Sequence, residues 1–337
     1  MRIRAHRFTT DRDSWVARAL VLCAIPALVV ASCGGGGAGP SEPEDPELPP
    51  PEGIQLDPAT GFYFGSYEWA EWRPGTLPVV LSAPHGGDIE PEVIPDRSGS
   101  GIVTVRDSRT IETTEAAAAA LEDLTGERPH VVILHLRRTK LDANRALPEA
   151  ALGDPNAGRA WAEYHALIDS AKARVIADNG AGLYLDMHGH GHRVQRLELG
   201  YLLNSTELET RDDATLDAQD GFDTSMRALG ERTTEPFSAI LRGPESFGGL
   251  LEPQAIPSVP SPRWPDPQVD TPDGRESFFS GGYSTQRHGS LNGGTIDGIQ
   301  IEHNFSGIRD TAGNRASYAE ELAEVVKLWI DRWYPGG

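Results

Sequence analysis

The feature that most constrains the fold is the alternation of strand-like and helix-like segments after residue 54. Short apolar runs bounded by proline or glycine predict buried strands, and longer alanine-rich or amphipathic stretches predict helices. Strands are expected at 77–82, 130–134, 183–187 and 296–301, and helices at 109–124, 154–179 and 318–333. Helices that connect strands act as crossovers. The pattern therefore predicts a three-layer α/β fold, with a mainly parallel or mixed central sheet covered by helices on both faces.

The amino-terminal segment has a different composition from the rest. A basic stretch from Arg2 to Arg18 precedes an apolar run at 19–31, which is too short to span a bilayer because a membrane helix takes about 20 residues. The run ends in Val30-Ala31-Ser32-Cys33, a sequence that resembles a bacterial lipobox. We predict a lipoprotein signal peptide at 1–32 and a lipid anchor on Cys33, hence an exported protein of the cell envelope. The alternative is an ordinary secretory peptide.

The remaining chain is divided into a linker and one domain. Residues 33–53 are rich in glycine, proline and acidic residues, which predicts a flexible tether. Residues 54–335 contain no second linker of that length, so a single domain is expected there. The chain has two cysteines, Cys23 in the signal and Cys33 at its end. Any metal ion in the domain must then be held by histidine and carboxylate.

The net charge limits the possible partners. The formal charge is −20 and the isoelectric point about 4.9. Nucleic acids and anionic membrane surfaces are bound by clustered Lys and Arg, so neither is expected as a partner of the domain. Membrane attachment is expected only through the lipid on Cys33.

Three predicted strands end in polar side chains. These are His85, Asp88 and Glu90 after the first strand, Asp186 and His188 at the third, and Glu302 and His303 at the fourth. In open α/β sheets, ligands bind at the carboxyl ends of the strands. Two imidazoles and a carboxylate from separate strand ends suit a zinc site with an open position for water, and a further carboxylate can serve as the base.

The same residues resemble a known family. The segments Ala83-Pro84-His85-Gly86-Gly87, Leu141-Asp142-Ala143-Asn144-Arg145, Asp186-Met187-His188 and Ile301-Glu302-His303-Asn304 occur in the order found in N-formylglutamate amidohydrolase-like proteins. Those proteins belong to the zinc carboxypeptidase-like group. The resemblance covers roughly residues 79–328. The run from His85 to Pro91 is also similar to the metal loop of phage poly-γ-glutamate hydrolases.

The resemblance implies a Zn²⁺ site and roles for its residues. His85 and His188 would be ligands, and Glu302 would act as general base and then acid. The third ligand is Asp88 if the loop follows the carboxypeptidases and Glu90 if it follows the poly-γ-glutamate hydrolases. We predict Glu90.

A basic segment follows the second predicted strand. Its cations are Arg137, Arg138, Lys140 and Arg145, and in a strongly acidic protein they suit an anionic substrate. Asn144 and Arg145 resemble the carboxylate-binding pair of carboxypeptidases, and Arg138 is the candidate for oxyanion stabilisation. Asp142 and Asp186 are expected to orient the ligand histidines or the arginines. Tyr283, in the glycine-rich segment 278–289, is expected to contact substrate. A solvated surface loop is the alternative for the basic segment.

These features together predict a zinc-dependent amidohydrolase. Its substrate would carry an amide next to a free carboxylate, as in N-acyl-glutamate, γ-glutamyl compounds or the C-terminal end of a peptide. N-formylglutamate itself is a cytoplasmic metabolite and fits an exported lipoprotein poorly. The alternative is a metal- or ligand-binding surface lipoprotein without turnover, which would use the histidines but would not need Glu302.

Overall fold

The computed structural model describes residues 53–218, 223–269 and 277–335. The predicted signal peptide, the lipidation site Cys33 and nearly all of the predicted tether lie outside these ranges. Among the described helices, none combines the length and the apolar character that crossing a membrane requires.

Within these ranges, nine strands form one mixed sheet in the order β1-β2-β3-β5-β4-β6-β9-β7-β8. The strands are β1 (Gln55–Leu56), β2 (Tyr63–Phe64), β3 (Ala70–Arg73), β4 (Val79–Ala83), β5 (His130–Leu134), β6 (Gly182–His190), β7 (Leu197–Gly200), β8 (Ser258–Val259) and β9 (Ile296–Asn304). The central strands β5, β4, β6 and β9 are mutually parallel. Antiparallel partners flank them, with β3 beside β5 and β7 beside β9. The predicted three-layer α/β architecture is therefore confirmed, with a mixed sheet.

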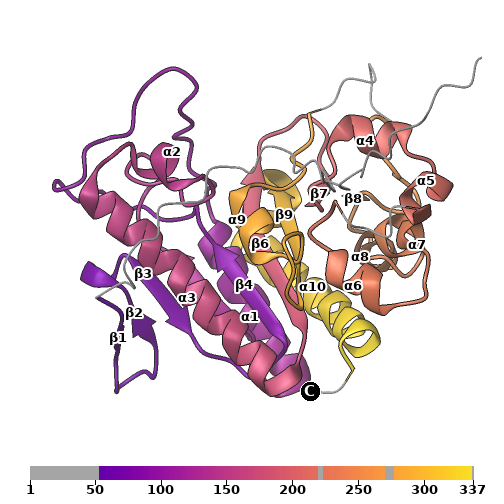
Figure 1. Cartoon of the computed structure of the whole chain (residues 1–337), viewed down its shortest axis with the longest axis horizontal. Helices are drawn as coiled ribbons and strands as arrows, with labels where there is room; N and C mark the ends of the chain where they lie inside the picture. The colour runs from indigo at the N-terminus through magenta and orange to yellow at the C-terminus, as the bar shows by residue number, and fades with distance from the viewer. Residues whose placement is uncertain (1–52, 219–222, 270–276, 336–337) are drawn as a thin grey trace, which may run out of the picture. The chain divides into compact units, whose positions relative to one another are not determined.

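Helices cover both faces of the sheet (Figure 1). They are α1 (Thr110–Thr125), α2 (Leu147–Ala151), α3 (Pro155–Asn179), α4 (Ser205–Thr210), α5 (Asp213–Ala218), α6 (Arg227–Arg232), α7 (Phe237–Arg242), α8 (Phe247–Leu251), α9 (Tyr283–His288) and α10 (Ala312–Trp333). Helix α3 packs against β3, β4, β5 and β6, while α1 and α10 pack together on the other core layer. The short helices α4 to α8 group together beside α10 (Figure 1).

Alternating side chains divide the core into two layers. Along β6, Leu183 and Leu185 belong to the layer under α1 and α10, whereas Tyr184 belongs to the layer under α3. Because side chains of a strand alternate between faces, Asp186 and His188 lie on the α3 side of the sheet. This alternation selects the face on which the polar strand ends gather.

The long elements follow the sequence pattern closely. Helix α3 starts where Asp154 accepts hydrogen bonds from the backbone N–H groups of Asn156 and Ala157, and it ends at Gly180, whose φ is 78°. Proline at the first helical position and a left-handed glycine after the last turn explain both boundaries. Strands β1 to β3, β7 and β8 were not predicted.

Candidate metal centre

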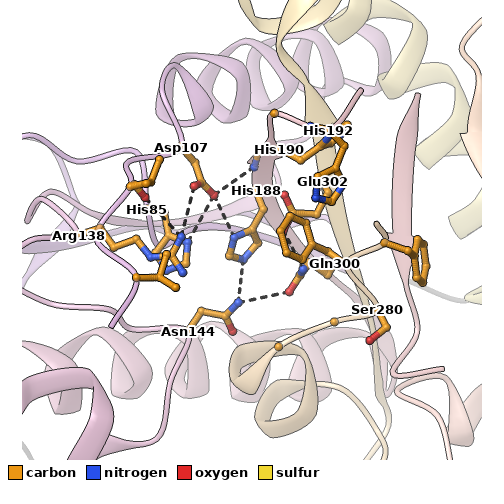
Figure 2. Close-up of a pocket in the computed structure, with 18 of the residues that line it drawn as sticks. His85, Asp107, Arg138, Asn144, His188, His190, His192, Ser280, Gln300 and Glu302 are labelled. Carbon is orange, nitrogen blue, oxygen red and sulfur yellow. Dashed lines mark hydrogen bonds and ion pairs between the residues drawn. The ribbon is translucent and has the colours of Figure 1, made fainter. Parts of the chain in front are cut away.

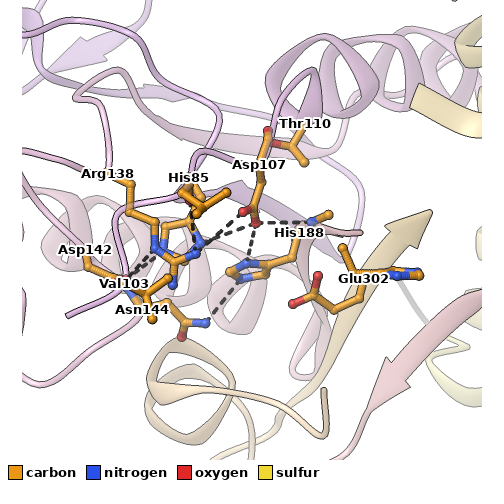
Figure 3. A network of polar contacts seen from close by, with 12 residues as sticks. His85, Val103, Asp107, Thr110, Arg138, Asp142, Asn144, His188 and Glu302 are labelled. Carbon is orange, nitrogen blue, oxygen red and sulfur yellow. Dashed lines mark hydrogen bonds and ion pairs between the residues drawn. The ribbon is translucent and has the colours of Figure 1, made fainter. Parts of the chain in front are cut away.

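Two buried histidines turn the same type of nitrogen towards one carboxylate. His85 Nδ1 lies 3.4 Å from Asp107 Oδ2, and His188 Nδ1 lies 3.3 Å from the same oxygen (Figure 3). The three ligand atoms lie within 4.8 Å of one another. Ligands bound at about 2.0–2.1 Å around a tetrahedral zinc ion lie about 3.3 Å apart, so the spacing fits such an ion. We call His85, Asp107 and His188 the first ligand group.

The opposite nitrogen of each histidine is held by a second aspartate. His85 Nε2 lies 2.6 Å from Asp142 Oδ1, and His188 Nε2 lies 2.9 Å from Asp186 Oδ2. A carboxylate at Nε2 keeps the proton on that nitrogen and leaves the Nδ1 lone pair for a metal ion. His85 Nδ1 is buried and has no hydrogen-bond partner among the described residues. This arrangement is typical of metal-binding histidines.

The centre contains three buried aspartates, and Arg138 balances part of their charge. Burial favours the neutral acid, yet the neighbouring imidazoles of His188 and His85 hold the pKa of Asp107 well below its ordinary value. The pKa values of Asp142 and Asp186 are lowered in the same way, since neighbouring imidazoles outweigh burial. Burial opposes protonation of His188, but the attraction of Asp186 outweighs it and raises the pKa of His188. Three ionised carboxylates around two imidazoles would stabilise a bound cation.

The structure does not bring Glu90 or Asp88 to the two histidines. Glu90 is half-exposed, and its Oε1 lies 3.0 Å from Arg137 Nη1. The side chain of Asp88 is 78% exposed and lies near Arg106. The reason is the path of the loop: Ile89 exchanges backbone hydrogen bonds with His135 and Arg137, which continues the parallel pairing of β4 with β5 beyond both strands and directs Glu90 away from the centre.

The two glycines after His85 serve close packing. A Cβ on Gly86 would come within 2.8 Å of the backbone nitrogen of Ile111, and one on Gly87 within 2.3 Å of the backbone of His135. The loop therefore passes tightly between the start of α1 and the end of β5. This close packing holds the backbone that follows His85.

Sequence reasoning missed Asp107. This residue ends the loop between β4 and α1, and its backbone N–H donates to the carbonyl of His85 at 3.1 Å. Its own carbonyl accepts from Thr110 Oγ1 at 2.8 Å, which fixes it to the first turn of α1. An acidic residue shortly before a predicted helix usually reads as a capping residue. The one available signal was therefore ambiguous.

Glu302 lies beside the first ligand group. It is paired in register with His188 on the neighbouring strand, and its carboxylate points towards that histidine (Figure 3). Its Oε1 accepts from Gln300 at 3.0 Å, whereas Oε2 is buried without a hydrogen-bond partner among the described residues. Burial raises the pKa of Glu302 to about 8, against the attraction of His188 and with the repulsion of Asp107 and Glu198.

The first ligand group opens into a pocket of about 510 Å³ (Figure 2). Its walls include Arg138, Asn144, Arg145, His190, His192, Phe278, Phe279, Gln300 and Glu302. The volume suits a small molecule or the end of a larger one. The glycine-rich segment 278–282 forms part of the wall.

The predicted substrate residues differ in their access to this pocket. Arg138 is largely buried and donates from Nε to Asp142 at 2.9 Å. Arg145 is about one-third exposed and pairs with Glu149. The Asn144 amide lies 3.4 Å from His188 Nε2 and accepts from the backbone of Ser284, so it is engaged within the protein.

Tyr283 does not line the pocket. Its ring packs against Trp161 and His165, with centroid distances of 5.8 and 5.5 Å. Tyr283 begins α9 and its ring faces α3, while Phe278 and Phe279, earlier in the same segment, reach the pocket wall.

Comparisons with known proteins find distant likenesses among solved structures, including the two that follow. No protein-family model and no curated protein matches the sequence. The gene product Atu2144 from Agrobacterium tumefaciens is similar at 13% identity and a TM-score of 0.40, over 78% of this chain and 94% of that one. The N-formylglutamate amidohydrolase from Ralstonia eutropha JMP134 is similar at 13% identity and a TM-score of 0.47, over 77% of this chain and 94% of that one. The second carries the family name that the sequence motifs resemble, but neither likeness by itself assigns a function to this chain.

Proposed function

We propose that the protein is a zinc-dependent amidohydrolase that cleaves an amide next to a free carboxylate. One observation carries the proposal: His85 and His188 both turn Nδ1 to Asp107 while buried aspartates hold their Nε2 atoms. Two imidazoles and one carboxylate form the donor set of hydrolytic zinc sites, which keep a position open for water. Zinc bound there would polarise a carbonyl and lower the pKa of its water.

Glu302 is the group best suited to move the proton. It lies in register with His188, and its buried Oε2 makes no hydrogen bond within the described chain. A base works best when its pKa lies near the working pH, and burial moves the pKa of Glu302 towards neutrality. We assign it the removal of a proton from the attacking water and its delivery to the leaving nitrogen.

Two arginines support the anionic part of the reaction. Arg138 lies at the pocket wall next to Asp107 and Asp142, where a cation can stabilise the oxyanion that forms on the carbonyl. Arg145 is the more exposed of the two and has donors left to bind a substrate carboxylate in two parallel hydrogen bonds. Asn144 would act indirectly, because its amide is hydrogen-bonded to Gln300 and to the backbone of Ser284 and so holds the pocket wall in place.

The proposal extends to location. The lipobox-like sequence before Cys33 favours an exported lipoprotein attached to the membrane by its lipid. γ-Glutamyl polymers and peptides with free carboxyl ends are substrates available outside the cytoplasm, so these are preferred to N-formylglutamate.

The competing function is capture of a metal ion or ligand without turnover. Capture needs the ligand histidines but no base. A buried glutamate with an unpartnered oxygen beside the ligands is costly to keep unless it has a task, which favours the enzyme.

The test is a substrate screen with the purified, zinc-loaded full chain. N-acyl-glutamates, γ-glutamyl peptides and C-terminal peptides are offered with and without a chelator, alongside matched amides that lack the free carboxylate. We expect chelator-sensitive release of amine from at least one carboxylate-bearing class and little from its matched amide. Zinc binding without hydrolysis of any of them would refute the amidohydrolase and favour capture.

A further inference from the structure

A second cluster of potential ligands lies at the same pocket. His190 ends β6, His192 follows in the next turn, and Glu198 lies in β7. One ligand atom from each lies within 4.8 Å of the others. His190 and His192 line the pocket, on the wall that also carries Glu302 (Figure 2). We call these three residues the second ligand group.

The spacing of this group suits a metal ion. Glu198 Oε1 lies 2.6 Å from His192 Nδ1 and 4.0 Å from His190 Nδ1. These two distances bracket the separation of about 3.3 Å expected between ligands of a tetrahedral zinc ion. Small rotations of the His192 and Glu198 side chains would equalise them.

Hydrogen bonds also prepare the three side chains. His190 Nε2 lies 2.9 Å from the carbonyl of Arg196, which places the proton on Nε2 and leaves the Nδ1 lone pair on the side of Glu198. The backbone N–H of His192 donates to that lone pair at 3.1 Å, so a bound ion would replace this one hydrogen bond. Glu198 Oε2 accepts from the backbone of Phe279 at 2.7 Å, which leaves Oε1 directed at the histidines.

Two buried carboxylates at this position would be stabilised by a bound cation. Glu198 and Glu302 are directly opposite each other in the antiparallel pair of β7 and β9, and both are buried. Like charges at opposed positions destabilise a sheet, and burial increases the repulsion. An ion bound by Glu198 would relieve this repulsion.

We infer that His190, His192 and Glu198 form a second site for a zinc-class transition metal ion, beside the first ligand group. Two nitrogens and one carboxylate oxygen favour Zn²⁺, Co²⁺ or Ni²⁺ over Ca²⁺ and Mg²⁺, which prefer oxygen ligands alone. The side chain of His192 is 17% exposed, which gives an ion a route from the pocket. The inference goes beyond the proposed function, since it concerns metal content and not turnover.

Metal stoichiometry of the full chain tests the inference. The protein is saturated with Zn²⁺, dialysed, and its zinc content is measured for wild type, His192→Ala, Glu198→Gln and His188→Ala. We expect two ions in wild type and one in each variant, with the affinity of the lost ion reduced at least about 100-fold. His135→Ala is the matched control: His135 is half-buried and pairs with Glu71 on the other side of the sheet, so this variant should keep two ions.

Spectroscopy provides a second test if His192→Ala or Glu198→Gln folds poorly. In His188→Ala loaded with Co²⁺, only the second ligand group remains, and visible d–d bands of tetrahedral-type cobalt are expected. One zinc ion in wild type, or two ions that persist in both His192→Ala and Glu198→Gln, would overturn the inference. Two ions without any hydrolysis would support it and refute the proposed function, whereas hydrolysis with a single ion would do the reverse.

Discussion

The first and second ligand groups hold their histidines by different means. In the first ligand group, buried aspartates bind the Nε2 atoms of His85 and His188. In the second, His190 is held by a backbone carbonyl, and His192 bonds directly to the carboxylate that would share its ion. A charged partner makes a histidine a stronger ligand than a carbonyl does, because it raises the basicity of the ring.

This difference separates the expected tasks of the two groups. The first group is enclosed and charged, and it lies next to Glu302, so it is prepared for tight metal binding and chemistry. The second is more open and must break its own ion pair to admit a metal. We therefore expect the first site to bind zinc more tightly than the second.

The largest expected effect comes from Glu302→Gln. The amide keeps the size of the side chain but takes no proton, and general bases contribute roughly 10²- to 10⁴-fold to rates. We expect kcat to fall by that factor while both zinc ions remain bound. Steady-state kinetics and zinc analysis of the same sample measure the two quantities. Glu90→Gln is the control and should retain full activity, because Glu90 lies at the surface with Arg137.

A retained rate in Glu302→Gln would end the proposed role of this glutamate. Loss of the first zinc ion in the same variant would have a different meaning. It would mean that Glu302 binds the metal ion, so that it could no longer be regarded as a separate group that moves the proton.

The aspartates behind the histidines give the next effect. Asp142→Asn and Asp186→Asn keep a hydrogen-bond acceptor at Nε2 but remove its charge, and such changes lower metal affinity about 10- to 100-fold. We expect that loss at the first site and no change at the second. Competition with a zinc chelator measures both affinities. Equal weakening of both sites would show that the charge acts over the whole pocket. The proposed difference between the two ligand groups would then be wrong.

The contrast between long and short elements explains how far the sequence could be interpreted. Strands β4, β5, β6 and β9 carry apolar runs bounded by turn residues, and parallel strands share one carboxyl edge. His85, His188 and Glu302 could therefore be assigned to this carboxyl edge of the sheet from the sequence alone. Strands β1, β2 and β8 have two residues each, and helices α4 to α8 have five or six. A two-residue strand shows a single alternation and a helix of five or six residues has fewer than two turns, so neither repeats its pattern often enough to be recognised.

Two candidate ligands were not predicted from the sequence, because their positions depend on contacts between distant segments. Asp107 reaches the histidines because its loop bonds to the backbone of His85, and Glu198 reaches His192 because β7 pairs with β9. Glu90 was favoured because the run from His85 to Pro91 resembles the metal loop of poly-γ-glutamate hydrolases, but the pairing of Ile89 with Leu136 decides where it points. Local spacing does not determine such pairings, since they are set by the packing of the whole sheet.

The smallest effect concerns His130, a buried histidine far along the chain from either ligand group. Its Nδ1 accepts hydrogen bonds from Trp72 Nε1 at 3.3 Å and from the backbone of Gly75 at 3.1 Å. Burial, helped by Arg174, lowers the pKa of His130 from 6.5 to about 4. Between these values the unfolded chain binds more protons than the folded one, so this residue's contribution to stability is present above pH 6.5 and is lost as the pH falls towards 4.

His130→Asn should reduce this acid sensitivity. The amide oxygen of asparagine can replace Nδ1 as the acceptor and does not titrate. At pH 5.5, wild type should lose about 1.4 kcal/mol more than the variant, relative to each protein at pH 7.5. Urea unfolding at both pH values, with chelator present to remove the contribution of bound metal, measures the difference. If the two proteins lose stability equally, His130 is already charged in the folded state at pH 5.5. Burial would then not lower the pKa of His130, and the contrast with His188, whose pKa is raised by Asp186, would be wrong.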